Sequence, residues 1–194
     1  MVGKSFRKLE LWGSIFNIFA TTFLIFSYKL SNNAVWSIIF ASANHSLWEH
    51  IKSFFLPFIF WIIIEISLIP KVPFRRLVAS KVIALYSFLI LNILSFYLLS
   101  YLKDINLFES FIIFYLFLII SYLISYIIFC SNLNTEKLFY FSLILLMIFV
   151  FMYINFTAKV PKLKIFKDPL SGIYGIIPKK YDTGAIYLNK NTNY

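Results

Sequence analysis

The side chains best suited to chemistry lie in one short stretch of the sequence, residues 44–52. This stretch contains both histidines of the chain, His45 and His50, together with Glu49 and Lys52. General acid–base catalysis and proton transfer within a membrane both use a carboxylate and an imidazole held close together. Glu49 and His50 are therefore the candidate catalytic residues.

The same stretch could bind a divalent metal ion, since imidazole and carboxylate are ligands that such ions prefer. His45, Glu49 and His50 are the candidate ligands. Their spacing differs from His-Glu-x-x-His, and the chain has one cysteine. A metal site would therefore need a further carboxylate from another helix, and we expect no other cofactor.

A purely structural interpretation of this stretch is also open. Ser46 precedes Glu49 by three residues and an apolar run follows, which is the pattern of a capping box at the start of a helix. Trp48 is typical of a membrane interface, where Lys52 could extend its charge into water. Either interpretation must explain the same polar site, which comprises Asn44, His45, Trp48, Glu49, His50, Lys52 and Glu65.

The composition places these groups in a membrane protein. Hydrophobic residues make up 61% of the 194 residues and charged residues only 13%, whereas about a quarter of a soluble domain is charged. No nucleic-acid-binding motif is present, so the net charge of +10 favours the lipid bilayer and anionic lipid head groups as partners. The predicted fold class is an all-α integral membrane protein.

We expect about five transmembrane helices, because that number of long apolar runs fits the bilayer thickness. A nine-residue apolar stretch leads into the polar site and is too short to span. Residues 34–52 are thus predicted to form an interfacial or re-entrant amphipathic helix, with His45 and Glu49 on one face. The spans lie near residues 11–28, 53–69, 77–102, 107–130 and 138–156, so residues 1–156 form the membrane domain and residues 157–194 a basic, irregular tail.

The distribution of basic residues predicts the orientation. The N-terminus and the second loop share one side of a five-span protein and are both basic, so the positive-inside rule places them in the cytoplasm of a cell-membrane protein. The tail then falls outside despite its lysines. A complete crossing by residues 34–52 would bring it inside. The basic residues in question are Lys4, Arg7, Lys8, Lys71, Arg75 and Arg76, and, in the tail, Lys159, Lys162, Lys164, Lys167, Lys179, Lys180 and Lys190.

The tail has a motif of its own. Asp168 and Pro169 precede Gly172, a combination typical of a tight turn. The apolar run around Tyr174 is too short to span a membrane, and we expect it to bury against the protein. Asp168 could then pair with His45, His50 or Lys52 and close over the polar site. The alternative is a basic tail lying on anionic head groups.

Two of these stretches resemble motifs of a known family. Residues 44–52, Asn-His-Ser-Leu-Trp-Glu-His-Ile-Lys, are similar to an Asn-Glu-Ser-x-Trp-Glu-His-x-Lys motif in small, uncharacterised multi-pass membrane proteins of bacteria and archaea. Residues 166–175 resemble that family's second signature. This chain has His45 where the motif has an acid. The resemblance singles out Trp48, Glu49, His50, Lys52, Asp168 and Gly172, and it implies no activity.

Three classes of function are compatible with the sequence. The sparse set of ionisable groups favours a non-catalytic membrane subunit or scaffold, in a homo- or hetero-oligomer. The alternative is a membrane-embedded enzyme or a transporter that uses a polar site around His45, Glu49 and His50. A buried cavity at these residues would favour the alternative, and an arc facing open water would favour the scaffold.

Overall fold

The computed structural model describes residues 2–68, 73–102, 106–131 and 133–176. Within these ranges the protein is built from helices, with no strand beyond an isolated antiparallel bridge between Lys167 and Tyr174. The long helices are α1 (Val2–Leu30), α2 (Leu47–Leu68), α3 (Phe74–Leu102), α4 (Leu107–Cys130) and α5 (Thr135–Ala158), and the 3-10 helices are η1 (Val35–Ile39) and η2 (Lys164–Phe166).

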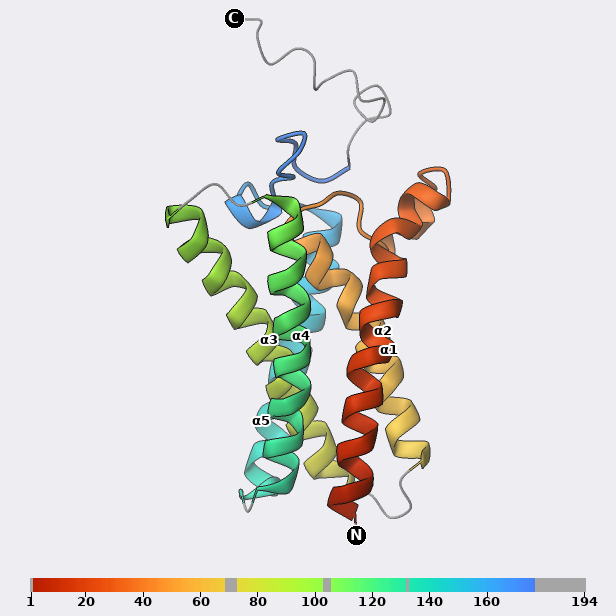
Figure 1. The fold of residues 1–194 in the computed structure, drawn as a ribbon, viewed down its shortest axis with the longest axis vertical. Helices are drawn as coiled ribbons and strands as arrows, with labels where there is room; N and C mark the ends of the chain where they lie inside the picture. The colour runs from red at the N-terminus through yellow and green to blue at the C-terminus, as the bar shows by residue number, and fades with distance from the viewer. Residues whose placement is uncertain (1, 69–72, 103–105, 132, 177–194) are drawn as a thin grey trace, which may run out of the picture.

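Five of these helices, α1 to α5, are long and apolar enough to cross a membrane. Helices suit this environment because they satisfy their own backbone hydrogen bonds where no water is available. They alternate in direction, with the N-terminus at the lower end of the bundle in Figure 1 and the segment after α5 at the upper end. The prediction of an all-α membrane protein with five spans is confirmed.

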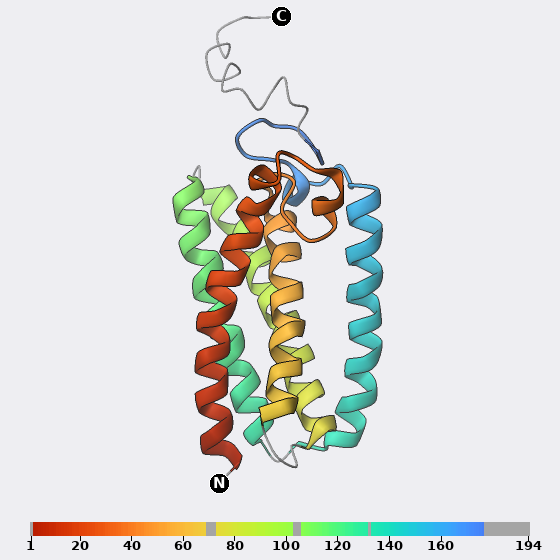
Figure 2. The same ribbon diagram turned by 90° about the vertical axis from the view of Figure 1, so that its right-hand side faces the viewer.

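Each helix of the bundle packs against one or more of the others. Helix α3 contacts both α4 and α5, and α1 contacts both α2 and α4. Figure 2 shows α5 at one edge of the bundle. The core is largely aromatic, and Phe54, Phe88 and Phe114 are almost completely buried. The outward faces carry exposed leucine, isoleucine and phenylalanine, as expected for helices that contact lipid.

The structure corrects the prediction of one amphipathic helix over residues 34–52. Only Val35–Ile39 forms a short 3-10 helix, residues 40–46 are not helical, and α2 begins at Leu47. The physical reason lies in local side-chain hydrogen bonds. Asn44 Oδ1 accepts from the backbone N–H of Ser46 at 2.7 Å, which competes with helix formation. His45 and Glu49 therefore do not share a helix face.

This loop begins and ends at the upper end of the bundle, between the end of α1 and the start of α2 (Figure 1). It makes no sixth crossing, so the segment after α5 lies at the opposite end from the N-terminus. The first helix also differs from the prediction, because it begins at Val2 and not near residue 11. Glu10 is consequently part of a membrane helix, and it is only 4% exposed.

A close approach between α1, α2 and α4 depends on Gly13. A Cβ atom at this position would lie 2.3 Å from Trp61 Nε1 and 2.6 Å from Tyr122 Cε1. Both neighbours are large buried rings that cannot move apart without disturbing the core.

We therefore expect Gly13→Ala to destabilise the protein by about 1–3 kcal/mol, the usual cost of overpacking a core. Thermal denaturation of the purified protein in detergent measures this. Phe19→Leu, at a position of α1 that is 72% exposed, is the matched control and should leave the melting temperature unchanged. Equal stability of Gly13→Ala and the unmodified protein would contradict the contact.

Candidate functional site

A buried ion pair lies at the start of α2. Lys52 Nζ is 2.7 Å from Glu49 Oε2, and the two side chains are 0% and 6% exposed. Lys52 Nζ also donates to the backbone carbonyl of Ile38 at 2.9 Å. The lysine thus joins the first turns of α2 to η1, and its charge is balanced inside the protein. We call this ion pair, with Ser42, Asn44 and Asp168, the upper cluster.

Glu49 caps α2 differently from the predicted capping box. Its backbone N–H donates to Ser46 Oγ at 3.4 Å, as that pattern requires. Its carboxylate reaches further back and accepts from the backbone N–H of Ala43 at 2.7 Å. The N–H of Ser46, which the carboxylate would bind in a reciprocal box, is already used by Asn44.

Ser42 adds a second link between the loop and α2. Its hydroxyl donates to the backbone carbonyl of Glu49 at 2.9 Å and lies 2.9 Å from Ser53 Oγ. The loop before α2 is therefore held by Lys52, Glu49 and Ser42 together. This arrangement satisfies polar groups that water cannot reach.

The segment after α5 docks onto this loop, as the sequence predicts. Asp168 Oδ1 accepts from the backbone N–H of His45 at 2.8 Å, and Asn44 Nδ2 donates to the carbonyl of Gly175 at 2.8 Å. The observed partner of Asp168 is thus the main chain of His45, while Lys52 is paired with Glu49. Two segments more than 120 residues apart in sequence meet here.

The turn chemistry of the tail motif is also present. Asp168 Oδ2 accepts from the backbone N–H and the hydroxyl of Ser171, at 2.6 and 2.7 Å. Gly172 has a φ of +72°, which favours glycine, and its N–H donates to the carbonyl of Asp168 at 2.9 Å. Pro169 lies within this turn, and Tyr174 closes it through the bridge to Lys167.

The two rings expected at a polar surface are buried instead. Trp48 is 1% exposed and packs against Phe149, Phe156 and Phe166, so it is not an interfacial tryptophan. The reason is that α5 and η2 cover the first turn of α2. His50 is 4% exposed and stacks on Phe111, with a distance of 4.8 Å between ring centroids.

The environment of His50 includes the other histidine. The centroid of the His45 ring lies 5.9 Å from that of His50. Within the described part of the chain, His50 Nε2 is buried and has no hydrogen-bond partner. No group of three or more metal-ligating side chains occurs among the described residues, and the metal-ligand role of His45, Glu49 and His50 stays a prediction.

Glu65 belongs to a second cluster and not to the upper one. It lies 16 residues after Glu49, about 24 Å along the same helix. Lys81 Nζ is 2.7 Å from Glu65 Oε1 and 2.8 Å from Glu10 Oε2, with side-chain exposures of 0–4%. We call Glu10, Glu65 and Lys81 the lower cluster, because they lie near the lower ends of α1, α2 and α3.

Neighbouring side chains complete the lower cluster. Trp61 Nε1 donates to Glu65 Oε1 at 2.9 Å, and Ser125 Oγ donates to Glu10 Oε1 at 2.6 Å. The sequence singled out Glu65 as a polar-site residue, whereas Glu10 was missed. In the sequence, Glu10 stands directly before an apolar run. An acidic residue in that position is easily taken for an ordinary charge flanking a membrane helix.

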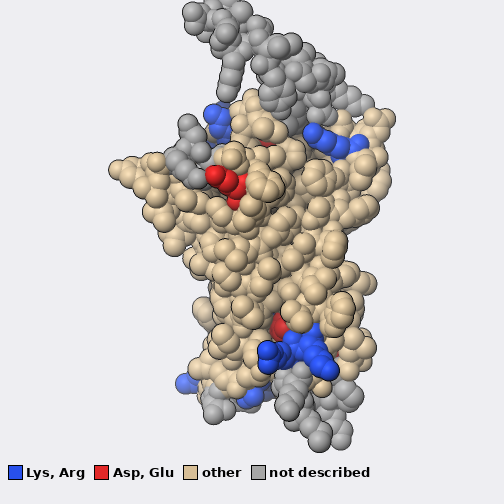
Figure 3. All heavy atoms as spheres, in the orientation of Figure 1, with Lys and Arg blue, Asp and Glu red and all other residues tan. Residues whose placement is uncertain are grey.

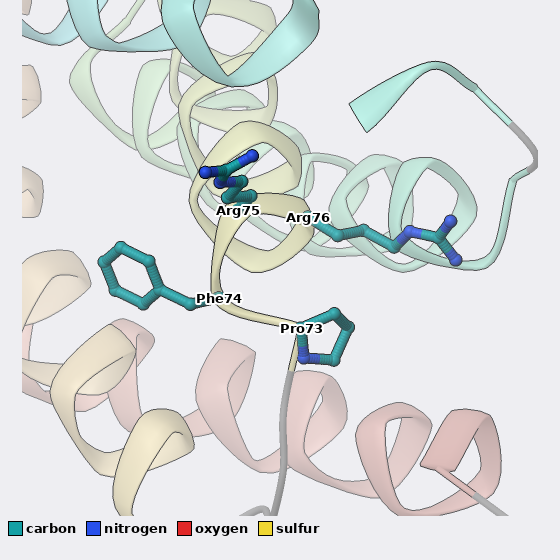
Figure 4. A pocket seen from close by; sticks show the side chains of 4 residues that line it. All are labelled: Pro73, Phe74, Arg75 and Arg76. Carbon is teal, nitrogen blue, oxygen red and sulfur yellow. The ribbon is translucent and has the colours of Figure 1, made fainter. Parts of the chain in front are cut away.

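Basic side chains also lie at the lower end, outside this cluster. The space-filling view shows a group of Lys and Arg side chains there (Figure 3). Arg75 and Arg76 extend from the first turn of α3 and line a shallow pocket with Pro73 and Phe74 (Figure 4). The guanidinium of Arg75 lies 5.9 Å from the ring centroid of Phe139. An interaction with anionic lipid head groups remains a prediction for this surface.

A family model matches residues 3–176, a range that includes nearly all of the five helices and the docked segment. The chain belongs to DUF6512, a family of unknown function. This confirms the membership in a family of unknown function that the sequence motifs predicted. No curated protein and no solved structure matches the chain. The DUF6512 match covers both the upper and the lower cluster.

For this DUF6512 protein, we expect Glu49→Gln and Lys52→Met each to cost about 3–5 kcal/mol, because each leaves a buried charge without its partner. The double variant should cost less than the sum of the two, since neither charge then remains. Thermal denaturation of the four proteins measures this coupling. Asn155→Ala, at an exposed position of α5, is the control. Strictly additive losses would show that the pair is not coupled.

Proposed function

We propose that this protein is a non-catalytic membrane subunit or scaffold that holds residues 159–176 on the upper end of its helix bundle. The observation that carries the proposal is that the charged groups of the upper cluster bind other parts of the same protein. Lys52 and Glu49 bind each other and the backbone of the preceding loop, and Asp168 binds the backbone of His45. A catalytic acid or base must instead reach a substrate.

The burial of the cluster supports the same role. As whole residues, Glu49, Lys52 and Asp168 are at most 4% exposed, so they do not form the arc facing water that the sequence offered as one outcome. Glu65 pairs with Lys81 and not with this cluster. These groups fix the loop before α2 to the segment after α5. The result is a rigid surface at one end of the membrane domain, made from two distant parts of the chain, which suits the binding of a partner protein or a second copy.

The second candidate is an enzyme or transporter that uses His45, Glu49 and His50. One observation favours it: His50 Nε2 is buried without a hydrogen-bond partner among the described residues. Such an atom is a ready ligand for a metal ion or a proton. This candidate predicts stoichiometric divalent metal in the purified protein, which His50→Gln would abolish.

We expect native mass spectrometry of the protein, extracted in mild detergent, to show one defined complex heavier than the monomer. Asp168→Ala should reduce the fraction of this complex on the order of tenfold, since it removes charge-assisted hydrogen bonds worth about 1.5–3 kcal/mol. Asn155→Ala is the matched control, because among the described residues the Asn155 side chain donates within its own helix, to the carbonyl of Phe151.

Two results would contradict the scaffold. If native mass spectrometry detects a monomer under all extraction conditions, the protein is not a subunit of a complex. Stoichiometric metal that is lost in His50→Gln, measured by elemental analysis, would support the second candidate in its place. Tryptic cleavage after the exposed Lys164 and Lys167 reports separately whether Asp168→Ala has released the docked segment.

The orientation that we propose places the lower end in the cytoplasm of a cell-membrane protein, as the basic N-terminus and second loop indicate. The single cysteine, Cys130, is exposed at the lower end of α4. We expect a membrane-impermeant maleimide to label it only after the cells are permeabilised. In a Cys130→Ser background, Leu170→Cys at the upper end should react in intact cells. The reverse pattern of labelling would invert the topology.

A further inference from the structure

The lower cluster has an unequal number of acidic and basic groups. Two carboxylates, Glu10 and Glu65, share the single ammonium group of Lys81. All three residues are at most 4% exposed, and they come from three different helices. If every group were ionised, the cluster would carry one net negative charge within the membrane domain, where an unbalanced charge is costly.

The surroundings provide no second cation among the described residues. Lys81 Nζ lies over the ring of Tyr122, 4.7 Å from its centroid, and within 6 Å of the rings of Phe6 and Phe58. The titratable or charged groups that face Glu65 are Glu10 from α1, Lys81 from α3 and Tyr122 from α4. Only Lys81 is cationic, so one proton on a carboxylate would make the cluster neutral.

The hydrogen bonds distinguish the two carboxylates. Both oxygens of Glu10 accept, Oε1 from Ser125 and Oε2 from Lys81. In Glu65, by contrast, Oε1 accepts from both Lys81 and Trp61, while Oε2 is buried and has no partner in the described part of the chain. The donors therefore fit an ionised Glu10, and the vacant oxygen belongs to Glu65.

A second buried acceptor on α1 has no donor within the described residues. Asn17 is 0% exposed, and its Oδ1 makes no hydrogen bond, while its Nδ2 donates to Tyr122 Oη at 2.6 Å and to the carbonyl of Gly13. Tyr122 also contacts Lys81, so this acceptor lies on the Tyr122 side of the lower cluster. Buried acceptors without donors are uncommon and call for a proton, a water molecule or an ion.

From these observations we propose that the lower cluster is a proton-binding site, in which Glu65 carries one proton on Oε2 and Glu10 remains the counter-ion of Lys81. The site exchanges its proton with the lower side of the membrane, because Glu65 lies in the last turn of α2, three residues before the helix ends at Leu68. This inference is independent of the scaffold role, since it concerns the other end of the bundle.

The proposal predicts a difference between two otherwise similar substitutions. Glutamine has the shape of a protonated glutamic acid, so Glu65→Gln should shift the melting temperature by no more than roughly 2 °C. Glu10→Gln removes the charge that balances Lys81, so Glu65 must ionise in its place although its Oε2 has no donor among the described residues. The melting temperature should then fall by about 5 °C. Equal losses for the two variants, or a larger loss for Glu65→Gln, would overturn the assignment of the proton to Glu65.

Infrared spectroscopy of the full-length protein in lipid vesicles gives a direct readout. At neutral pH we expect a carbonyl band of a protonated carboxylic acid that shifts in D₂O, is lost in Glu65→Gln and is kept in Glu109→Gln. Lys81→Met should add a second such band, because Glu10 then has no counter-ion.

Two results, one spectroscopic and one thermal, would contradict the proposal. One is the absence of a protonated carboxyl band at neutral pH. The other is a melting temperature that rises with sodium concentration in the unmodified protein but not in Glu65→Gln, which would assign the site to a monovalent cation in place of the proton. Should Lys81→Met fail to fold, the comparison of Glu65→Gln with Glu109→Gln still decides the question.

Discussion

The interior of a membrane has no water to solvate a charge, so a charged side chain within a bundle must find its partners there. Two buried lysines, Lys52 and Lys81, satisfy this requirement. Lys52 is completely buried and binds a carboxylate and a backbone carbonyl at the upper end. Lys81 is completely buried and binds two carboxylates at the lower end. The Glu49–Lys52 pair and the lower cluster are each built around one of these ammonium groups.

The two clusters satisfy their charges in different ways. At the upper end, Lys52 pairs with Glu49 and binds a backbone carbonyl, while Asp168 accepts from the backbone N–H groups of His45 and Ser171. These bonds join distant chain segments. At the lower end, one ammonium meets two carboxylates and leaves an oxygen of Glu65 without a donor among the described residues. The first arrangement suits a fixed structural contact, whereas the second suits the reversible binding of a proton that we propose.

The sequence predicted the features that follow from length and local chemistry. A span needs about twenty apolar residues, so hydropathy alone located the five helices. The Asp168 turn and its apolar flank indicated a docked tail, which the contact with His45 bears out. The break before α2 was missed, because the amphipathic pattern continues through residues that bind their own backbone. Glu10 was missed because its partner, Lys81, lies 71 residues away.

The burial of Trp48 has a consequence for how the chain is made. The rings that cover this tryptophan, Phe149, Phe156 and Phe166, belong to the last helix and the segment that follows it. Because synthesis runs from the N-terminus, α2 is inserted well before these rings leave the ribosome. Its polar first turns and a large indole must wait at the membrane surface, uncovered, until the end of translation. A chain that stops before α5 would lack all three rings and keep that surface open to quality-control proteases and to aggregation.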